Sequence, residues 1–544
     1  MTPAPAPVFQ HLPAMAKNAS GMSIDDELPV DTEEGEPGSL LERLMLSGTY
    51  LSVEISTLFL QMLFDFDFKK RFTRVFIRYY GRFMQTILRL HDKKEIPTRM
   101  VDISVQLFSN SMLTVQMIRE EALLSTLFRN IMALMPEQAD PSVDSTPAHV
   151  TLNCEHPIWT KRTYWPITND LVNILSHRAV ISEFLFRVDI VTEWLAVARR
   201  FQSIDVHKRE VRQHVEVENR HWTSPFFIEL ELVMEQLSLL DAGVKDILNH
   251  PMLPEPGEPV IEGTQIICAM QQILALGIKT CQEWLQSDAV GAQWGAFHAE
   301  GSESGVLPMR FRVSQQPVTL HIPLHRFVAF FASQVCRQCD SPLPEILPVQ
   351  DSPSFIRALV EHPLRIQVLL AQIRAGMWRL NGETMFRRGW FYRSAYFYDL
   401  GFDLDLFLLQ CAAVLLPTDE LLLTLIDRFA LVDYLGFSDP RPNDDADMDS
   451  GNSLPSNEPD VCTVITEDMM VLIAAILSER ARLGLTDDEC IRQEVIARLC
   501  VKPHSHSQLS EAICRRWNEH DKFESVLLEV ANFEAPKSHR MEQG

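Results

Sequence analysis

The side chains in this chain best suited to chemistry are two histidines and two cysteines in one short stretch. His321 and His325 have the spacing His-x3-His, and Cys336 and Cys339 have the spacing Cys-x2-Cys. Both spacings are permissible for tetrahedral zinc, so these four residues are the candidate metal ligands. The alternative is a structural role, because the histidines would lie at the end of a β-hairpin and the cysteines on a helix. A metal-dependent reaction would have to depend on this set.

A second candidate site is basic and aromatic. Residues 387–393 read Arg-Arg-Gly-Trp-Phe-Tyr-Arg, and Arg387, Arg388, Trp390 and Arg393 are candidate partner contacts. Arginine and aromatic residues are enriched at protein interfaces, and a basic patch on an acidic protein could dock a partner. The alternative is a surface loop that packs its own aromatic rings.

Trp378 and Arg379 offer a third candidate, a peptide-binding edge formed through stacking or cation–π contact. The simpler interpretation buries Trp378 and pairs Arg379 with a carboxylate.

No residue is assigned a catalytic or cofactor-binding role. The chain has only 21 glycines, and it has neither a Gly-rich phosphate loop nor a Gly-x-Ser-x-Gly nucleophile turn. Its 73 acidic residues make carboxylate pairs common, so no such pair indicates general acid–base catalysis.

Helical periodicity dominates the part of the chain that carries these candidates. One stretch with apolar residues at i, i+3, i+4, i+7 and i+11 is Leu404, Phe407, Leu408, Cys411 and Leu415. We therefore predict a mainly α fold, with a large helical-bundle scaffold over residues 39–436. No repeat of constant period is convincing, so a solenoid is not predicted.

The period changes to two over residues 309–322. Phe311 and Val313 alternate with arginines, and Val318, Leu320 and Ile322 alternate with polar residues. The segment Ser-Gln-Gln-Pro separates the two runs, which predicts a small β-hairpin. The proline that follows the hairpin predicts the start of a helix.

The remaining segments are two tails, a linker and a small C-terminal unit. Residues 1–38 are predicted to be a disordered tail, 437–460 a disordered acidic linker and 536–544 a second tail. Residues 461–535 are predicted to form a helix plus a winged-helix-like module. Its last helix carries Glu524 and Glu529 against Lys522 alone, which favours a protein partner over DNA.

Charge and composition limit the partners and the compartment. The 544 residues have a formal net charge of −24 and a pI near 5.1, so neither nucleic acid nor an anionic membrane surface is an expected partner. No apolar run of about 18 residues, the length that a membrane helix needs, is apparent. The N-terminus does not resemble a signal peptide. The ten cysteines are scattered, which predicts a reducing compartment, the cytoplasm or the nucleus.

Several short blocks in one order carry a resemblance to a known family. They are residues 104–108 (Ser-Val-Gln-Leu-Phe), 212–217, 311–314, 321–326, 361–365 (Glu-His-Pro-Leu-Arg), 377–382 (Met-Trp-Arg-Leu-Asn-Gly), 405–410 and 492–507. Together they cover about residues 45–535. The chain resembles the middle helical and winged-helix region of the N-recognins, the UBR-type E3 ubiquitin-protein ligases of the N-degron (N-end rule) pathway.

The resemblance implies a role in protein ubiquitination and degradation. N-recognins bind destabilising N-terminal residues and recruit a ubiquitin-conjugating enzyme, so that enzyme and N-degron substrates are the implied partners, mostly through modules outside this chain. Zinc-binding UBR boxes and a RING domain do this work in the family. Within these 544 residues the only Cys-x2-Cys is Cys336–Cys339, so no cofactor and no transferase activity are expected of this chain alone.

Two readings of the chain remain open at this stage. It is expected to be the central scaffold of an N-recognin-type ligase, read from a truncated gene model or a short paralogue. The alternative is a non-catalytic interaction or regulatory protein derived from the same family.

Overall fold

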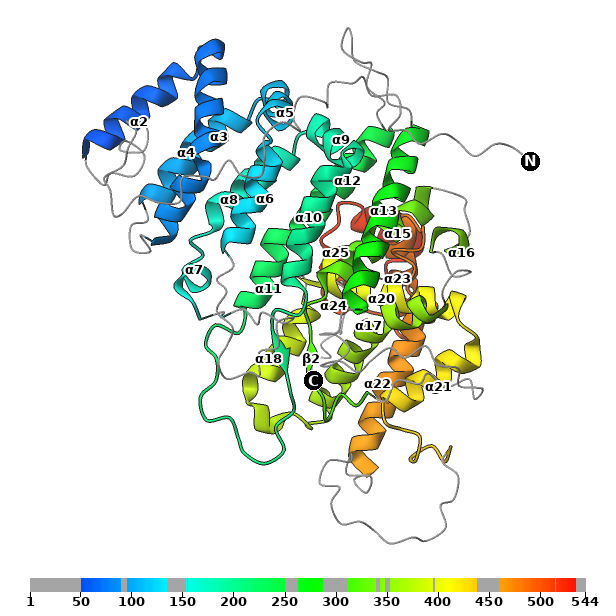
Figure 1. Cartoon of the computed structure of the whole chain (residues 1–544). Helices are drawn as coiled ribbons and strands as arrows, with labels where there is room; N and C mark the ends of the chain where they lie inside the picture. The colour runs from blue at the N-terminus through cyan, green and yellow to red at the C-terminus, as the bar shows by residue number, and fades with distance from the viewer. Residues whose placement is uncertain are drawn as a thin grey trace, which may run out of the picture.

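The computed structural model describes residues 50–89, 95–134, 153, 155–249, 263–286, 311–338, 343–347, 353–394, 397–437, 459–513 and 515–534. The two predicted tails, nearly all of the predicted acidic linker and residues 309–310 of the predicted hairpin lie outside these ranges. The described chain is mainly helical, with one two-stranded sheet, which confirms the predicted fold class. Figure 1 shows the helices following one another across the body roughly in chain order, from α2 and α3 to α13 and α15.

Nine helices form the described first part of the body. They are α2 (Tyr50–Met62), α3 (Phe66–Arg89), α4 (Glu95–Phe108), α5 (Ser111–Glu120), α6 (Leu123–Leu134), α7 (Pro157–Thr160), α8 (Trp165–Leu175), α9 (Arg178–Phe186) and α10 (Val188–Phe201). Local chemistry sets their ends. Asn110 caps α5, because its Oδ1 accepts from the backbone N–H of Leu113 at 2.9 Å. Helix α10 buries Val191, Trp194 and Ala198 at helical spacing.

The middle of the body is built around a helix that is buried on every side. The elements in order are β1 (Val206–His207), α11 (Ser224–Glu229), the π-helical segment Leu230–Met234, α12 (Glu235–Asn249), α13 (Gly263–Leu285), β2 (Val318–Thr319) and α15 (Pro323–Gln338). All residues of α15 from Pro323 to Val335 are buried. It packs closely on α13 at Gly277, where a Cβ atom would come within 2.6 Å of the Phe327 ring. Glycine at this position therefore lets the two helices approach.

The two strands show that the predicted hairpin is wrong in its pairing. Strand β2 pairs antiparallel with β1, with Val206 opposite Thr319 and His207 opposite Val318. The other predicted arm is a turn instead, in which the Arg312 carbonyl accepts from the N–H groups of Gln315 and Gln316 at 2.9 Å. Alternating apolar and polar residues predict an extended segment with two different faces, but they do not predict which other segment pairs with it.

The last part of the body contains the segments nearest to the candidate sites. They are α16 (Leu343–Ile346), α17 (Pro353–Arg374), the 3-10 turn Arg379–Asn381, α18 (Glu383–Tyr392), the π-helical segment Tyr398–Phe402, α20 (Asp403–Leu415), α21 (Thr418–Arg428) and α22 (Pro459–Ser478). Helix α17 begins ten residues before Pro363, which lies inside it. It ends before Gly376, whose φ of +78° is a left-handed conformation that favours glycine.

Helix α22 belongs to the body, although we predicted it as part of the C-terminal unit. Its buried residues, among them Cys462, Ile465 and Met469, join the main hydrophobic core, and it packs on α17 and α20. By length and composition alone, Asp460–Ser478 is also apolar enough to cross a membrane, so the expectation that no such stretch exists is wrong. About a third of this stretch (33%) is buried in the body, through the face that packs on α17 and α20.

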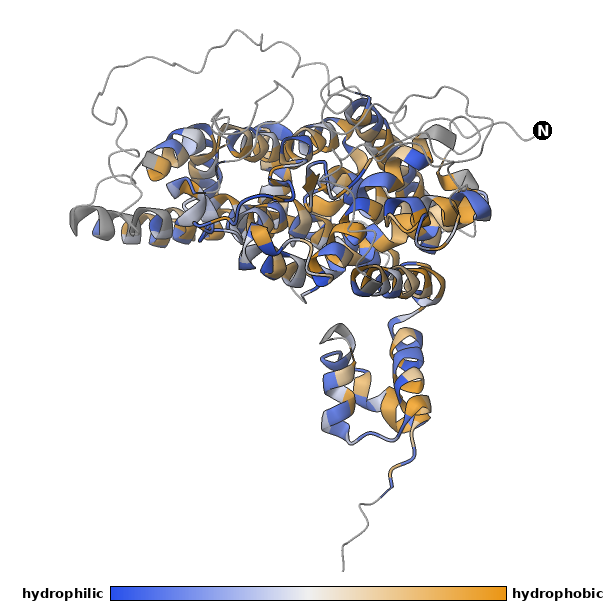
Figure 2. Cartoon of the chain, turned by 90° about the horizontal axis from the view of Figure 1, so that it is seen from below, coloured by the Kyte–Doolittle hydropathy of each residue, from blue (hydrophilic) through white to orange (hydrophobic). Residues whose placement is uncertain are grey.

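The C-terminal unit has a small hydrophobic core of its own. Its helices are α23 (Asp487–Val501), α24 (His506–Ala512), α25 (Arg515–Asn518) and α26 (Phe523–Val530). Ile491, Val495, Leu509 and Phe523 are among the buried residues of this second core, which Figure 2 shows in a group of helices set apart from the body. Ser505 caps α24 in a capping box with Gln508.

Candidate functional site

The structure does not bring the four predicted metal ligands together. His321 and His325 are both fully buried, and each already has a partner. His321 Nδ1 lies 2.6 Å from a carboxylate oxygen of Glu229, and His325 Nδ1 lies 3.1 Å from the amide nitrogen of Gln202. Burial lowers the pKa of His325 to about 3, so this imidazole is neutral.

Cys336 lies too far along α15 to share an ion with His325. Eleven residues of helix separate them, which is about 16 Å along the axis at 1.5 Å per residue. Cys339 lies outside the described residues. Within the part of the chain that the structure describes, no group of three or more His, Cys, Asp or Glu side chains could hold a metal ion.

The histidines instead lie at the edge of a buried ionic cluster. Arg326 donates from Nη1 to Glu229 at 2.7 Å, and from Nε and Nη2 to the two carboxylate oxygens of Asp405 at 3.1 and 2.9 Å. The Tyr392 hydroxyl donates to Asp405 at 2.6 Å. Arg326, Glu229 and Asp405 side chains are 0% exposed. This cluster joins α11, α15, α18 and α20 in one hydrogen-bonded network.

The charged groups of this cluster act on one another without access to solvent. Burial alone would raise the pKa of Glu229, but the charges of Arg326 and His321 and the hydrogen bond from His321 lower it. Burial outweighs the effect of Arg326 at Asp405, so the pKa of that carboxyl is raised. Because none of these groups reaches the surface, the cluster can hold helices together but cannot meet a substrate.

A second buried cluster has the same structural character. Glu361 Oε1 accepts from Arg365 Nε at 2.8 Å and from Arg428 Nε at 2.9 Å. The Arg365 guanidinium carbon lies 3.4 Å from the centroid of the Phe311 ring. These contacts tie α17 to α21 and to the turn before β2. The periodicity of the sequence contained no signal for either cluster, because it does not distinguish a buried charge from a solvated one.

The basic and aromatic segment is a helix, α18, and only part of it is exposed. Trp390 is 65% exposed and Phe386 is 62% exposed, one helical turn apart on the same face, with Arg393 three residues further on. Arg387 pairs with Glu383 at 2.9 Å. Phe386 was not among the partner contacts predicted from the sequence.

Arg388 is wrong as an exposed partner contact. Its side chain is buried, and its Nε lies 3.4 Å from the Asp205 carboxylate. Successive residues of a helix point about 100° apart, so Arg387 and Arg388 cannot occupy one face in the way that a loop would allow. Phe391 and Tyr392 are also buried.

The Met-Trp-Arg-Leu-Asn-Gly segment, residues 377–382, connects α17 to α18. Trp378 is buried as predicted, and its indole N–H donates to the Gln372 side chain at 3.1 Å. Gly382 has a φ of +87°, and a Cβ atom there would lie 2.8 Å from Glu218 Oε1. The Glu218 carboxylate accepts from the N–H groups of Glu383 and Thr384 at 2.8 and 3.1 Å. Glu218 thus caps α18 from a distant loop.

Two family models match the chain. Residues 50–451 match the UBR1/2/3-like ARM repeat domain, and residues 490–544 match the winged-helix domain described as E3 ubiquitin-protein ligase UBR1-like. The winged-helix match agrees with the predicted module. ARM repeats stack helical units into a solenoid, so leaving a solenoid out of the predicted fold was wrong. The reason is visible in the helix lengths, which vary from 4 residues in α7 to 24 in α3.

Curated relatives match over most of the chain. Human E3 ubiquitin-protein ligase UBR3 is 29% identical over 490 residues, which cover 88% of this chain and 23% of the relative. Human E3 ubiquitin-protein ligase UBR2 is 26% identical over 524 residues, 92% of this chain and 27% of the relative. E3 ubiquitin-protein ligase PRT6 of Arabidopsis thaliana is 32% identical over 254 residues, 43% of this chain and 12% of the relative. The chain thus spans about a quarter of the length of UBR3 and UBR2.

Proposed function

Because this chain belongs to the UBR1/2/3-like ARM repeat family, we propose that it is the central scaffold of an N-recognin-type E3 ubiquitin-protein ligase. In this role it orients a degron-binding module and a ubiquitin-transfer module relative to each other. It performs no chemistry of its own.

The buried Arg326 cluster is the observation that carries this proposal. It connects α11, α15 and the α18–α20 region, which are far apart in the sequence, through charged hydrogen bonds between side chains shielded from solvent. Such networks define one arrangement of the helices, because every other arrangement would leave a buried charge unpaired. A body with one arrangement is what a scaffold between two modules requires.

The implied partners are a ubiquitin-conjugating enzyme and proteins with destabilising N-terminal residues. Both would act on modules that the scaffold connects. We place the protein in a reducing compartment, the cytoplasm or the nucleus, which is supported by ten scattered cysteines in a chain of 544 residues.

A reconstituted ubiquitination assay tests the proposal. The purified chain, incubated with a ubiquitin-activating enzyme, a ubiquitin-conjugating enzyme, ubiquitin and a substrate with an N-terminal arginine, is expected to build no ubiquitin chains. Robust ligation by this chain alone would show that it carries catalytic residues and is more than a scaffold.

The second candidate is a non-catalytic regulator that competes with a complete ligase. The exposed Phe386 and Trp390 favour it, because large apolar side chains on one surface helix face are typical of a protein contact. Adding the chain in excess to a ligation reaction run by a full-length relative separates the two. Inhibition that Trp390→Ala abolishes supports the regulator, and an unchanged rate supports the scaffold.

A further inference from the structure

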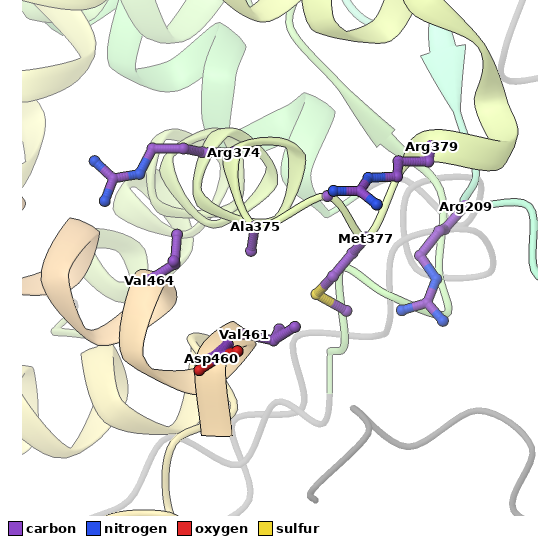
Figure 3. A pocket seen from close by; sticks show the side chains of 9 residues that line it. Arg209, Arg374, Ala375, Met377, Arg379, Asp460, Val461 and Val464 are labelled. Atoms are coloured by element: carbon purple, nitrogen blue, oxygen red, sulfur yellow. The ribbon is translucent and has the colours of Figure 1, made fainter. Parts of the chain in front are cut away.

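An open pocket of about 440 Å³ lies where the end of α17 meets the start of α22. Figure 3 shows Arg209 and Arg379 on one side of it and Asp460, Val461 and Val464 of α22 on the other, with Met377 between them. Arg374 also lines the pocket. Three arginines thus line a pocket with an apolar wall on a protein whose net charge is −24, although the Arg374 guanidinium points away from the other two.

Asn381 holds the backbone on both sides of Arg209. Its Nδ2 donates to the Lys208 carbonyl at 2.8 Å, and its Oδ1 accepts from the Glu210 N–H at 3.0 Å. Nε and Nη1 of Arg209 are shielded from solvent and have no hydrogen-bond partner among the described residues. Burial lowers the pKa of Arg209, as expected for a cation without a counter-ion. The Arg209 guanidinium therefore has hydrogen-bonding capacity that no described residue uses.

Gly376 holds Arg379 beside the pocket. The guanidinium packs directly over this glycine, so that a Cβ atom at residue 376 would lie 2.8 Å from Arg379 Nε. We predicted that Arg379 pairs with a carboxylate, but it forms no ion pair within the described part of the chain. Contacts within the chain thus place the backbone of Arg209 and the side chain of Arg379 beside the pocket.

The remaining charges leave the pocket with an excess of positive charge. Arg374 is already paired with Glu467 and, at 3.1 Å, with Asp468. Among the described residues that line the pocket, Asp460 is the one carboxylate, and it lies in the first turn of α22. The partial positive charge of a helix N-terminus offsets part of that carboxylate.

We propose that this pocket binds an acidic side chain of a partner peptide, with the carboxylate between Arg209 and Arg379. An aliphatic neighbour in the same peptide packs on Met377, Val461 and Val464. A carboxylate suits the planar guanidinium fork, which can donate two parallel hydrogen bonds to it. The apolar wall favours a peptide over a free inorganic anion, because an anion would leave that wall exposed to water.

Fluorescence anisotropy on the full chain tests the pocket. The probes are fluorescein-labelled peptides that read Leu-Glu-Leu-Glu-Leu and, as the neutral control, Leu-Gln-Leu-Gln-Leu. The acidic peptide is expected to bind more tightly, and Arg209→Gln with Arg379→Gln is expected to weaken it about tenfold or more, as for the loss of two charged hydrogen bonds. Asp460→Asn is expected to tighten it, since the variant removes a competing negative charge.

The matched control is Arg492→Gln with Arg498→Gln, which removes the same two charges from exposed positions of α23 in the C-terminal unit. Equal weakening by this variant, or equal binding of the two peptides, would overturn the proposal. Inorganic phosphate and the unlabelled acidic peptide are then compared as competitors. If phosphate displaces the probe at the same concentration as the peptide does, the pocket is a general anion site and the peptide assignment is wrong. Circular dichroism checks that each variant is folded. Asn381→Ala is a second variant that is expected to weaken binding of the acidic peptide, because it keeps both cations but releases the backbone at Arg209.

Discussion

Arg326 of α15 and Asp405 of α20 form a two-point ion pair in which both side chains are completely buried, with nitrogen–oxygen distances of 3.1 and 2.9 Å. The pair is satisfied further by Glu229 on one side and Tyr392 on the other. Its position at the crossing of α15 and α20 makes it the centre of the body. Removing the Arg326 cation should therefore lower the free energy of unfolding of the body.

Arg326→Met should destabilise the body by about 3–5 kcal/mol, because it leaves Glu229 and Asp405 buried without their cation. Denaturant unfolding followed by circular dichroism measures the change. Arg387→Met is the control, since Arg387 and its partner Glu383 are 51% and 66% exposed and such pairs contribute about 0–1 kcal/mol. Similar losses in the two variants would show that the buried cluster does not stabilise the body.

Asp170 should make stability depend on pH. Burial raises its pKa from 3.8 to about 7, although hydrogen bonds from Ser104 and Tyr80 oppose the rise. The folded state therefore holds this proton more tightly than the unfolded state, and the free energy of unfolding falls as pH rises between about 4 and 7. Asp170→Asn keeps an acceptor for the Tyr80 hydroxyl but cannot ionise.

The free energy of unfolding of Asp170→Asn, relative to that of the wild type, should therefore rise by about 2–3 kcal/mol between pH 5 and pH 8. Unfolding free energies of both proteins at the two pH values provide the measurement. A constant difference would mean that Asp170 titrates alike in the folded and unfolded chains.

Truncating the two tryptophans of the α17–α18 region should change the stability of the protein by very different amounts. Trp378→Ala should cost about 3–5 kcal/mol, because Trp378 is buried and its removal leaves a cavity. Trp390→Ala should change stability by no more than about 0.5 kcal/mol, because Trp390 is mostly exposed. Thermal unfolding compares them, and a large loss on truncating Trp390 would argue against an open partner surface there.

Glu218→Ala should loosen the start of α18 by about 1 kcal/mol, since two backbone N–H groups lose their acceptor. Hydrogen exchange at the amides of residues 383 and 384 should become faster, while exchange in the middle of α15 stays the same. Unchanged protection at both amides would show that another group caps the helix.

The purified chain should contain substoichiometric zinc, because His321 and His325 have other partners and Cys336 lies about 16 Å further along the helix. Elemental analysis measures the metal directly, and incubation with EDTA should leave the Tm unchanged. About one zinc per chain would restore the cysteine and histidine site as a real ligand set.

Much of the local structure could be read from the sequence. The i, i+3, i+4 spacing of Leu404, Phe407 and Leu408 predicted α20, and all three residues are buried. The order of short blocks, including Met-Trp-Arg-Leu-Asn-Gly, was sufficient to identify the family. Both results depend on patterns within short segments, which a sequence displays directly.

The candidate sites could not be read in this way. The spacing of His321, His325 and Cys336 is permissible for zinc, yet it says nothing of Glu229 and Gln202, which occupy the histidines from distant helices. Arg388 looked equivalent to Arg387 until the helix turned it toward Asp205.

The sequence by itself determined the helical class, the apolar faces of the helices and the family. Only the tertiary structure decided that β1 lies beside β2, that α22 joins the body and that Asn381 holds Arg209 at a pocket near Arg379. The physical reason is that periodicity records which face of a segment avoids water, whereas the segment that covers that face is chosen by packing among parts of the chain that are many tens of residues apart or more.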